Sequence, residues 1–291
     1  MNADDRVLDT YRFLRGGLVV MVVMLFASLI VVAITTDGCW QTSISAYYYT
    51  AAHSVFVASL CALGILLITY RGSNDTEDIL LDLAGVLAFV VAMVPTARPA
   101  NICGPALPDY VVDPAIRNNM WAVIAGLTFA KVAASVLYRS WRAGPSGVST
   151  YGRWAFAFFW AVTVFGVIAF VFFPTQFAQY GHTVAAILMF ACIIAVVVIN
   201  AYLAKNQPDC HPGYVRSYRV IAVTMLATLL VVAVSHELFN PDGGGWNYAV
   251  IWAEVLLIAQ FAIYWALQTR ELWDTTDRSE HVTCTPTVDK L

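Results

Sequence analysis

The stretch GLVVMVVMLFASLIVVAIT, which runs from Gly17 to Thr35, contains no charged side chain. About 20 apolar residues in an α-helix cross the hydrocarbon core of a bilayer, so this stretch predicts a membrane-spanning helix. Further stretches along the chain share its length and character. The sequence therefore predicts an all-α, polytopic helical membrane bundle with eight transmembrane helices, at approximately Gly17–Thr35, Tyr48–Thr69, Ile79–Ala97, Met120–Tyr138, Trp154–Phe173, His182–Leu203, Val220–Leu238 and Tyr248–Leu267.

The composition of the 291-residue chain supports this class and excludes others. Hydrophobic residues make up 60% and charged residues 12%, whereas ordinary soluble domains have roughly 45–50% and 25%. So little charge cannot cover a soluble surface, which excludes a cytosolic globular enzyme, a disordered regulator and a collagen-like fibre. With 16 Lys and Arg residues and a net charge of −3, nucleic-acid binding is excluded as the main role, because it needs clustered basic residues. We expect membrane lipid as the partner, together with a small molecule or other membrane subunits.

The basic residues predict how the bundle is oriented. Arg98 and Arg117 fall in loops on one side and Lys131 falls within a span, whereas all the others fall on the opposite side. Because Lys and Arg concentrate on the cytoplasmic side, we expect a multi-pass protein of the plasma (inner) membrane with both termini in the cytoplasm. Its first apolar run is longer than that of a usual signal peptide, so we expect a retained helix. Residues 1–273 would form a single membrane domain, and the polar residues 274–291 a disordered cytoplasmic tail.

The two halves of the chain resemble each other. HSVFVA at His53 is similar to HTVAAI at His182, and WAV at Trp121 to WAE at Trp252, with Arg139 and Arg270 at the same spacing. These matches predict a duplicated four-helix unit, with residues 11–142 and 151–273 as parallel repeats about an axis along the membrane normal. The alternative is chance similarity between apolar helices.

Two of the six cysteines predict a disulfide. Cys39 and Cys103 fall in neighbouring loops on the outer side, where the compartment permits disulfides. A Cys39–Cys103 bridge would tie the first two spans to the next two. The alternative is two unrelated small residues.

Ionisable side chains within a membrane are expensive and are functional candidates for that reason. Asp82 and Lys131 lie at similar depths near the cytoplasmic side of the third and fourth spans. Pairing lowers the desolvation cost of each, so we interpret them as a structural ion pair, with a proton relay as the alternative.

A second group of ionisable residues lies toward the outer side. His53, His182, His236 and Glu254 come from four different spans, with His182 at the start of its own. Imidazole and carboxylate groups are also zinc ligands. No ligand spacing within one helix supports a metal, so no metal site is predicted. The alternative interpretation is that these side chains form hydrogen bonds to loops and neighbouring aromatic residues.

The run SISAYYYT at Ser43–Thr50, together with Leu83–Val86 and Trp252–Glu254, resembles a pattern in uncharacterised bacterial multi-pass membrane proteins. That family has a basic residue and an acidic or amide residue where this chain has His53 and Ser54, whereas Glu254 fits the pattern. The resemblance implies no activity.

A looser likeness is to the alkaline ceramidase and adiponectin-receptor superfamily of membrane zinc hydrolases. That superfamily has Ser and His on one helix, Asp on the next, and a His pair on the last. Ser45 or Ser54 with His53, and Asp82, match in part, but the His pair of the last span is missing.

These residues support functions from different classes. The first is an integral membrane protein that binds or transports a lipid headgroup or small solute through an outer-leaflet polar pocket formed by Glu254, His53, His182 and His236. The second is a metal-dependent membrane hydrolase or transferase that acts on lipid with the same groups. The third is a haem-binding membrane protein with two of the histidines as axial ligands, or a structural subunit of a membrane complex. The sequence names no cofactor and leaves open whether the chain is an enzyme.

Overall fold

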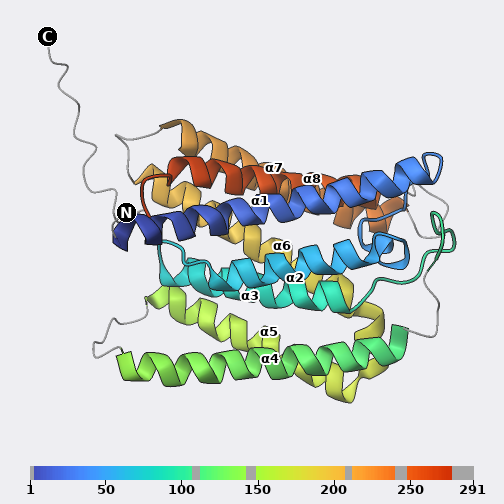
Figure 1. The fold of residues 1–291 in the computed structure, drawn as a ribbon, viewed down its shortest axis with the longest axis horizontal. Helices are drawn as coiled ribbons and strands as arrows, with labels where there is room; N and C mark the ends of the chain where they lie inside the picture. Colours follow the sequence, from blue (N-terminus) through green and yellow to red (C-terminus); the bar gives the residue numbers. More distant parts are fainter. Residues whose placement is uncertain (1–2, 107–111, 142–148, 207–211, 240–247, 277–291) are drawn as a thin grey trace, which may run out of the picture.

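The computed structural model describes residues 3–106, 112–141, 149–206, 212–239 and 248–276. Within these residues the chain is all-helical and contains no strand. Eight α-helices run roughly parallel or antiparallel to one another (Figure 1). The elements are α1 (Ala3–Thr35), the 3-10 helix η1 (Ser45–Tyr49), α2 (His53–Thr69), α3 (Asp75–Met93), α4 (Val112–Trp141), α5 (Thr150–Phe172), α6 (Pro174–Lys205), α7 (Pro212–Phe239) and α8 (Ala249–Glu271).

Five of the helices in the described ranges are long and apolar enough to cross a membrane, namely α1, α5, α6, α7 and α8. Helix α2 is apolar but has only 17 residues. The first turn of α3 is acidic, with Asp75, Glu77 and Asp78. The apolar helices fit a multi-pass integral membrane protein, while the count of eight spans stays a prediction.

None of the eight helices begins at the first residue of its expected span, and two of the differences concern the candidate site. Helix α2 begins at His53 rather than Tyr48, because the preceding residues form η1. Helix α6 begins at Pro174, two turns before the expected start at His182. Proline suits the first turn of a helix, since its missing N–H has no helical partner there. His182 therefore lies inside α6, where it can face the core instead of a loop.

The packing of neighbouring helices closes into a ring. Helix α1 packs against α2, α2 against α3, α3 against α6, α6 against α7, α7 against α8, and α8 against α1. Helices α4 and α5 lie outside this ring: α5 packs against α3 and α6, and α4 against α3. In Figure 1 they lie at the lower edge of the bundle, and α6 crosses behind α2. The ring surrounds the residues of the candidate site.

The expected repeat of residues 11–142 and 151–273 would make α3 equivalent to α7. The contact between α3 and α6 would then correspond to a contact between α7 and α2. Helix α3 packs extensively against α6, but the main packing partners of α7 among the described helices are α6 and α8 rather than α2. The four-helix repeat therefore stays a prediction.

Two glycines allow α2 and α3 to approach closely. A Cβ atom on Gly64 would lie 2.9 Å from the backbone oxygen of Gly85, and one on Gly85 would lie 2.5 Å from that of Gly64. Small residues allow such contacts between membrane helices, where apolar burial no longer drives association. This pair fixes the spacing of α2 and α3.

The two ends of the bundle contain different parts of the chain. The start of α1 lies beside the end of α8, since Arg12 Nε donates a 2.8 Å hydrogen bond to Trp273 O. We call this the terminal end (left in Figure 1). The opposite end holds η1 and the start of α8, where Ile251 N donates to Thr42 O at 3.1 Å. It also holds the Cys39–Cys103 bridge, and we call it the disulfide end. Residues 277–291 of the expected tail lie outside the described residues.

Candidate functional site

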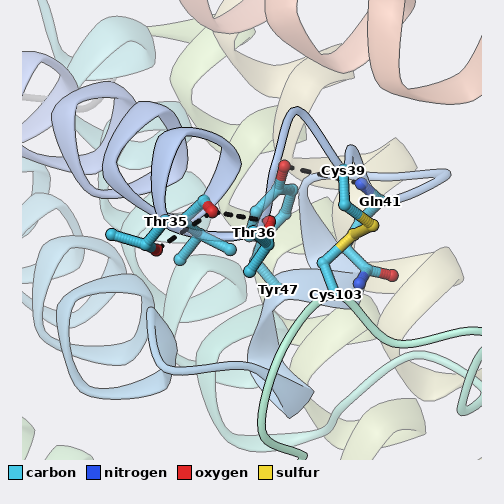
Figure 2. Close-up of a disulfide and its surroundings, with 7 residues drawn as sticks. Thr35, Thr36, Cys39, Gln41, Tyr47 and Cys103 are labelled. Carbon is cyan, nitrogen blue, oxygen red and sulfur yellow. Dashed lines mark hydrogen bonds between the residues drawn. A yellow bond between two sulfur atoms is a disulfide. The ribbon is translucent and has the colours of Figure 1, made fainter.

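The structure contains the Cys39–Cys103 disulfide that the sequence analysis expected, with 5.6 Å between the Cα atoms (Figure 2). The bridge joins the segment after α1 to the segment after α3. Beside it, Gln41 N contacts Tyr47 Oη at 3.5 Å. Burial raises the pKa of the Tyr47 phenol, and the contact with Gln41 opposes this only in part. The disulfide therefore holds the chain that enters η1 against the segment after α3.

Glu254 of α8 reaches the start of η1. Its Oε2 accepts a 2.5 Å hydrogen bond from Ile44 N, and its Oε1 lies 3.3 Å from Ser45 Oγ. Ile44 and Ser45 are buried, and Glu254 is partly buried. The carboxyl group of one helix is thus satisfied by a turn that lies 209 residues earlier in the chain.

His182 of α6 contacts the same serine from the other side. Its Nε2 lies 2.8 Å from Ser45 Oγ, and its Nδ1 lies 2.6 Å from Val94 O, at the end of α3. The imidazole is buried, and both of its nitrogens have partners. We call Glu254, Ser45 and His182 the Glu254 cluster. It connects η1, α6 and α8, and through Val94 it also connects α3.

The hydrogen-bond partners couple the protonation of Glu254 to that of His182. Val94 O can only accept, so Nδ1 of His182 carries a hydrogen. A neutral imidazole then accepts the Ser45 hydroxyl hydrogen at Nε2, which leaves Ser45 no hydrogen for Glu254. For both contacts of Oγ to carry a hydrogen at once, either Glu254 is protonated or His182 holds a second proton. In both cases the cluster holds one proton more than a carboxylate beside a neutral imidazole.

A small cavity begins at this cluster. Its volume is about 60 Å³, and Ser45 and Glu254 line it together with apolar residues of α1, α2, α3, α6 and α8, among them Leu63, Met189 and Phe261. We call it the central cavity. One water needs roughly 10–15 Å³ of such volume, so the cavity can hold a few waters. Drug-sized ligands fill pockets of about 300–1,000 Å³, so a larger ligand requires the helices to move.

No Lys or Arg side chain of the described ranges lies within ion-pair distance of Glu254. Within the described residues, its hydrogen-bond contacts come from Ile44 and Ser45, which are uncharged. Carboxylates accept up to four hydrogen bonds and attract cations. The cluster can therefore exchange its proton for a cationic group that supplies N–H donors.

A second polar cluster lies toward the terminal end of the same ring. Asn200 Nδ2 of α6 donates to Glu77 Oε1 of α3 at 2.7 Å, and Gln268 Nε2 of α8 lies 3.3 Å from Asn200 Oδ1. All three side chains are fully buried. Ser73 N also donates to Glu77 Oε2, at 2.9 Å. We call Glu77, Asn200 and Gln268 the Glu77 cluster, and it ties α3, α6 and α8 together.

Arg15 of α1 closes the terminal end beside the Glu77 cluster. Its side chain is fully buried, and its guanidinium donates to Leu272 O at 2.9 Å and Thr275 O at 3.1 Å. It also contacts Gln268 O at 3.4 Å. Gln268 and Leu272 lie at the end of α8, where a cation is favoured by the helix dipole, and Thr275 lies in the segment that follows. The buried charge therefore caps α8 and joins it to α1.

The other predicted outer residues lie apart from the Glu254 cluster or outside the described side chains. His53 begins α2, where its Nδ1 contacts Tyr48 O at 2.7 Å and its ring meets the Tyr48 ring edge-on at 4.3 Å. His236 lies in α7, and its side chain is outside those that the structure describes. The structure thus brings together Glu254 and His182 of the four predicted residues.

The Asp82–Lys131 pair has a third member. Lys131 Nζ lies 3.1 Å from Asp82 Oδ2, and Arg71 lies 3.7 Å from Asp82 Oδ1. The Lys131 side chain is 48% exposed and also lies over the Phe159 ring, 4.7 Å from its centroid. These contacts tie α3 to α4 and to the segment after α2.

Three kinds of residue in these clusters were not predicted from the sequence. Ser45 was considered only as a partner of His53, because its loop gave no spacing that relates it to His182. Glu77 was not predicted because the third span was expected to begin at Ile79. Asn200 and Gln268 were not predicted because only ionisable side chains were candidates. A neutral amide within a predicted span is a signal that could have identified both.

Comparison with protein-family models, with curated proteins and with solved structures finds no match to this chain. Within the described residues, no group of three or more His, Cys, Asp and Glu side chains is arranged to hold a metal ion. The interpretation of the site therefore depends on its geometry.

Proposed function

We propose that the chain is an eight-span protein of the plasma membrane, with the terminal end in the cytoplasm and the disulfide end outside. The adjacent ends of α1 and α8 support an even number of crossings. The Cys39–Cys103 bridge supports an oxidising outer side, since disulfides persist there. Arg15 and Lys205, both near the terminal end, follow the expected distribution of basic residues.

We propose further that the protein binds a small cationic group at the Glu254 cluster, carried by a solute or by a lipid headgroup. The observation that supports this is the single serine hydroxyl between Glu254 and His182, which couples the protonation of the carboxyl group to that of the imidazole. An ammonium group offers several N–H donors and a positive charge. It would take the place of a proton shared by Glu254, Ser45 and His182, and that proton would pass to the solvent.

Two polar clusters at opposite ends of the ring support transport rather than binding alone. Along α8, Glu254 and Gln268 are 14 residues apart, which is about 21 Å of helix. The apolar central cavity lies between them. The Glu254 cluster closes the outer end and the Glu77 cluster, with Arg15, closes the inner end. Opening one while the other stays closed would pass a ligand across.

Unfolding temperatures test the proposed binding. Purified protein in detergent receives ethanolamine, or acetate as an anion control, and nanodiscs compare phosphatidylethanolamine with phosphatidylglycerol. We expect an amine to raise the unfolding temperature of the wild type and of Glu271→Gln, a matched change at the terminal end of α8, but not of Glu254→Gln. Stabilisation by free ethanolamine identifies a solute, and stabilisation only by the amine lipid identifies a headgroup. The proposal is contradicted if no amine raises the unfolding temperature of the wild type, or if an amine raises that of Glu254→Gln by the same amount.

A second candidate function is a serine hydrolase that acts on lipid esters. It is supported by the 2.8 Å contact of Ser45 Oγ with His182 Nε2 and by the Val94 carbonyl that orients the imidazole, as in a nucleophile and base pair. Against it, Ser45 also contacts Glu254, and the central cavity is too small for an acyl group. Covalent labelling of Ser45 by a fluorophosphonate probe, lost in His182→Ala, would favour the enzyme.

A further inference from the structure

A second and larger cavity lies outside the ring. Its volume is about 540 Å³, and residues of α3, α4, α5 and α6 line it, among them Leu87, Ile124, Phe170 and Ala185. We call it the lateral cavity. It shares no lining residue with the central cavity, so it is a separate site. Its volume falls within the range of about 300–1,000 Å³ that bound organic ligands fill.

The walls of the lateral cavity are apolar and leave unfilled space between the helices. On α5, a Cβ atom added at Gly166 would meet nothing within 4 Å. Thr163 lines the same wall, and its buried hydroxyl oxygen has no partner within the part of the chain that the structure describes. An empty apolar cavity destabilises a helical bundle because its lining loses packing contacts. The apolar lining points to an apolar occupant.

The shape of the lateral cavity suits a hydrocarbon chain. It extends from Leu83 to Val90 on α3 and from Val162 to Phe170 on α5, which corresponds to about 10–12 Å of helix. Half of a bilayer's hydrocarbon core is about 15 Å thick. Its rim includes Phe165 and Val184, which are 72% and 51% exposed. The cavity therefore opens sideways, toward the position of lipid chains beside apolar helices.

We propose that the lateral cavity binds one hydrocarbon chain of a membrane lipid, held between α3, α4, α5 and α6. The chain fills the space beside Gly166 and contacts wall residues that the surrounding bilayer does not reach. Leu87 and Ala185 are such residues, since they are 6% and 3% exposed. This site does not depend on the function proposed for Glu254, because α4 and α5 lie outside the ring.

Photo-crosslinking tests the proposal. The full chain is placed in phosphatidylcholine vesicles that contain phosphatidylcholine or free palmitate with a diazirine in the acyl chain, illuminated, and mapped by peptide mass spectrometry. We expect adducts at Leu87 and Ala185 in addition to those on exposed lipid-facing residues such as Val223. Adducts at Val223 without adducts at the two wall residues would overturn the proposal, and this result needs no variant.

A matched pair of glycine variants sharpens the test. Gly166→Leu places a side chain in the lateral cavity, whereas Gly126→Leu places one in open space on α4, and neither added Cβ meets an atom within 4 Å. We expect Gly166→Leu to lower the adducts at Leu87 and Ala185 by about tenfold, because overpacking disfavours the bound chain. Gly126→Leu should label as the wild type does. Equal wall labelling in both variants, with monodisperse protein, would show that the wall adducts do not come from a chain in the space beside Gly166, which contradicts the proposal.

Discussion

Ser45 Oγ lies 2.8 Å from His182 Nε2, although the two residues are 137 positions apart in the chain. The same oxygen lies 3.3 Å from Glu254 Oε1. One hydroxyl thus joins η1 to α6 and α8 at the disulfide end of the ring. Because a hydroxyl carries a single hydrogen, it links the protonation of the carboxyl group to that of the imidazole.

Removal of this hydroxyl should destabilise the protein. In Ser45→Ala, both His182 and Glu254 lose a buried hydrogen-bond partner, which costs about 1–3 kcal/mol of unfolding free energy. Denaturant or thermal unfolding in detergent measures the difference. Ser54→Ala is the matched control, since Ser54 is exposed on α2. Equal stability of the two variants would mean that the cluster contributes nothing to the fold.

The disulfide should stabilise the disulfide end. Cys39 and Cys103 are 64 residues apart, and closing a loop of that length constrains the unfolded chain by about 2–4 kcal/mol. We expect a reductant to lower the unfolding temperature of the wild type but not that of a Cys39→Ser/Cys103→Ser variant. A reductant that affects both proteins alike would act elsewhere in the chain.

The same glycine substitution should have opposite effects on two helices. Gly85→Ala brings a Cβ atom to 2.5 Å from the backbone oxygen of Gly64, so α2 and α3 must separate. We expect a loss of about 1–3 kcal/mol. Gly126→Ala meets open space on α4 and should be neutral or gain up to about 1 kcal/mol from helix propensity. Unfolding curves of the two variants check this, and a stable Gly85→Ala would contradict the close contact.

Removing the carboxylate of Asp82 should destabilise the protein more than removing the charge of Lys131. Lys131 is half-exposed, so Lys131→Met should cost at most about 1 kcal/mol. Asp82→Asn leaves both Lys131 and Arg71 without their shared carboxylate and should cost more. Unfolding of the two variants and of the double variant measures the coupling. A larger loss in Lys131→Met than in Asp82→Asn would be inconsistent with a structural ion pair.

Labelling with a membrane-impermeant maleimide tests the orientation. Single cysteines at Asp37 and Lys205, which are exposed at opposite ends of the bundle, are introduced into a chain that keeps only the Cys39–Cys103 bridge. We expect Asp37→Cys to react in intact cells and Lys205→Cys to react only after permeabilisation. The reverse pattern would place both termini outside.

The sequence predicts the helical class and part of the site, for physical reasons. Long apolar runs form helices in lipid because every backbone group must be satisfied within the segment. Glu254 and His182 stand out because ionisable groups are rare in such runs. Ser45 does not stand out, since its role depends on how η1 folds under the disulfide. The buried Arg15 was assigned only to the cytoplasmic side, because the end of α8 that it caps is distant in sequence.

The binding of an amine to the Glu254 cluster can be followed by the proton that leaves it. Ethanolamine, free or as phosphatidylethanolamine, is titrated into lightly buffered wild-type protein and Glu254→Gln with a pH-indicator dye. The cluster geometry predicts the release of about one proton for each amine bound to the wild type, and neither binding nor release in Glu254→Gln. An amine that binds without releasing a proton, or that binds Glu254→Gln as tightly as the wild type, would contradict the assignment of this site.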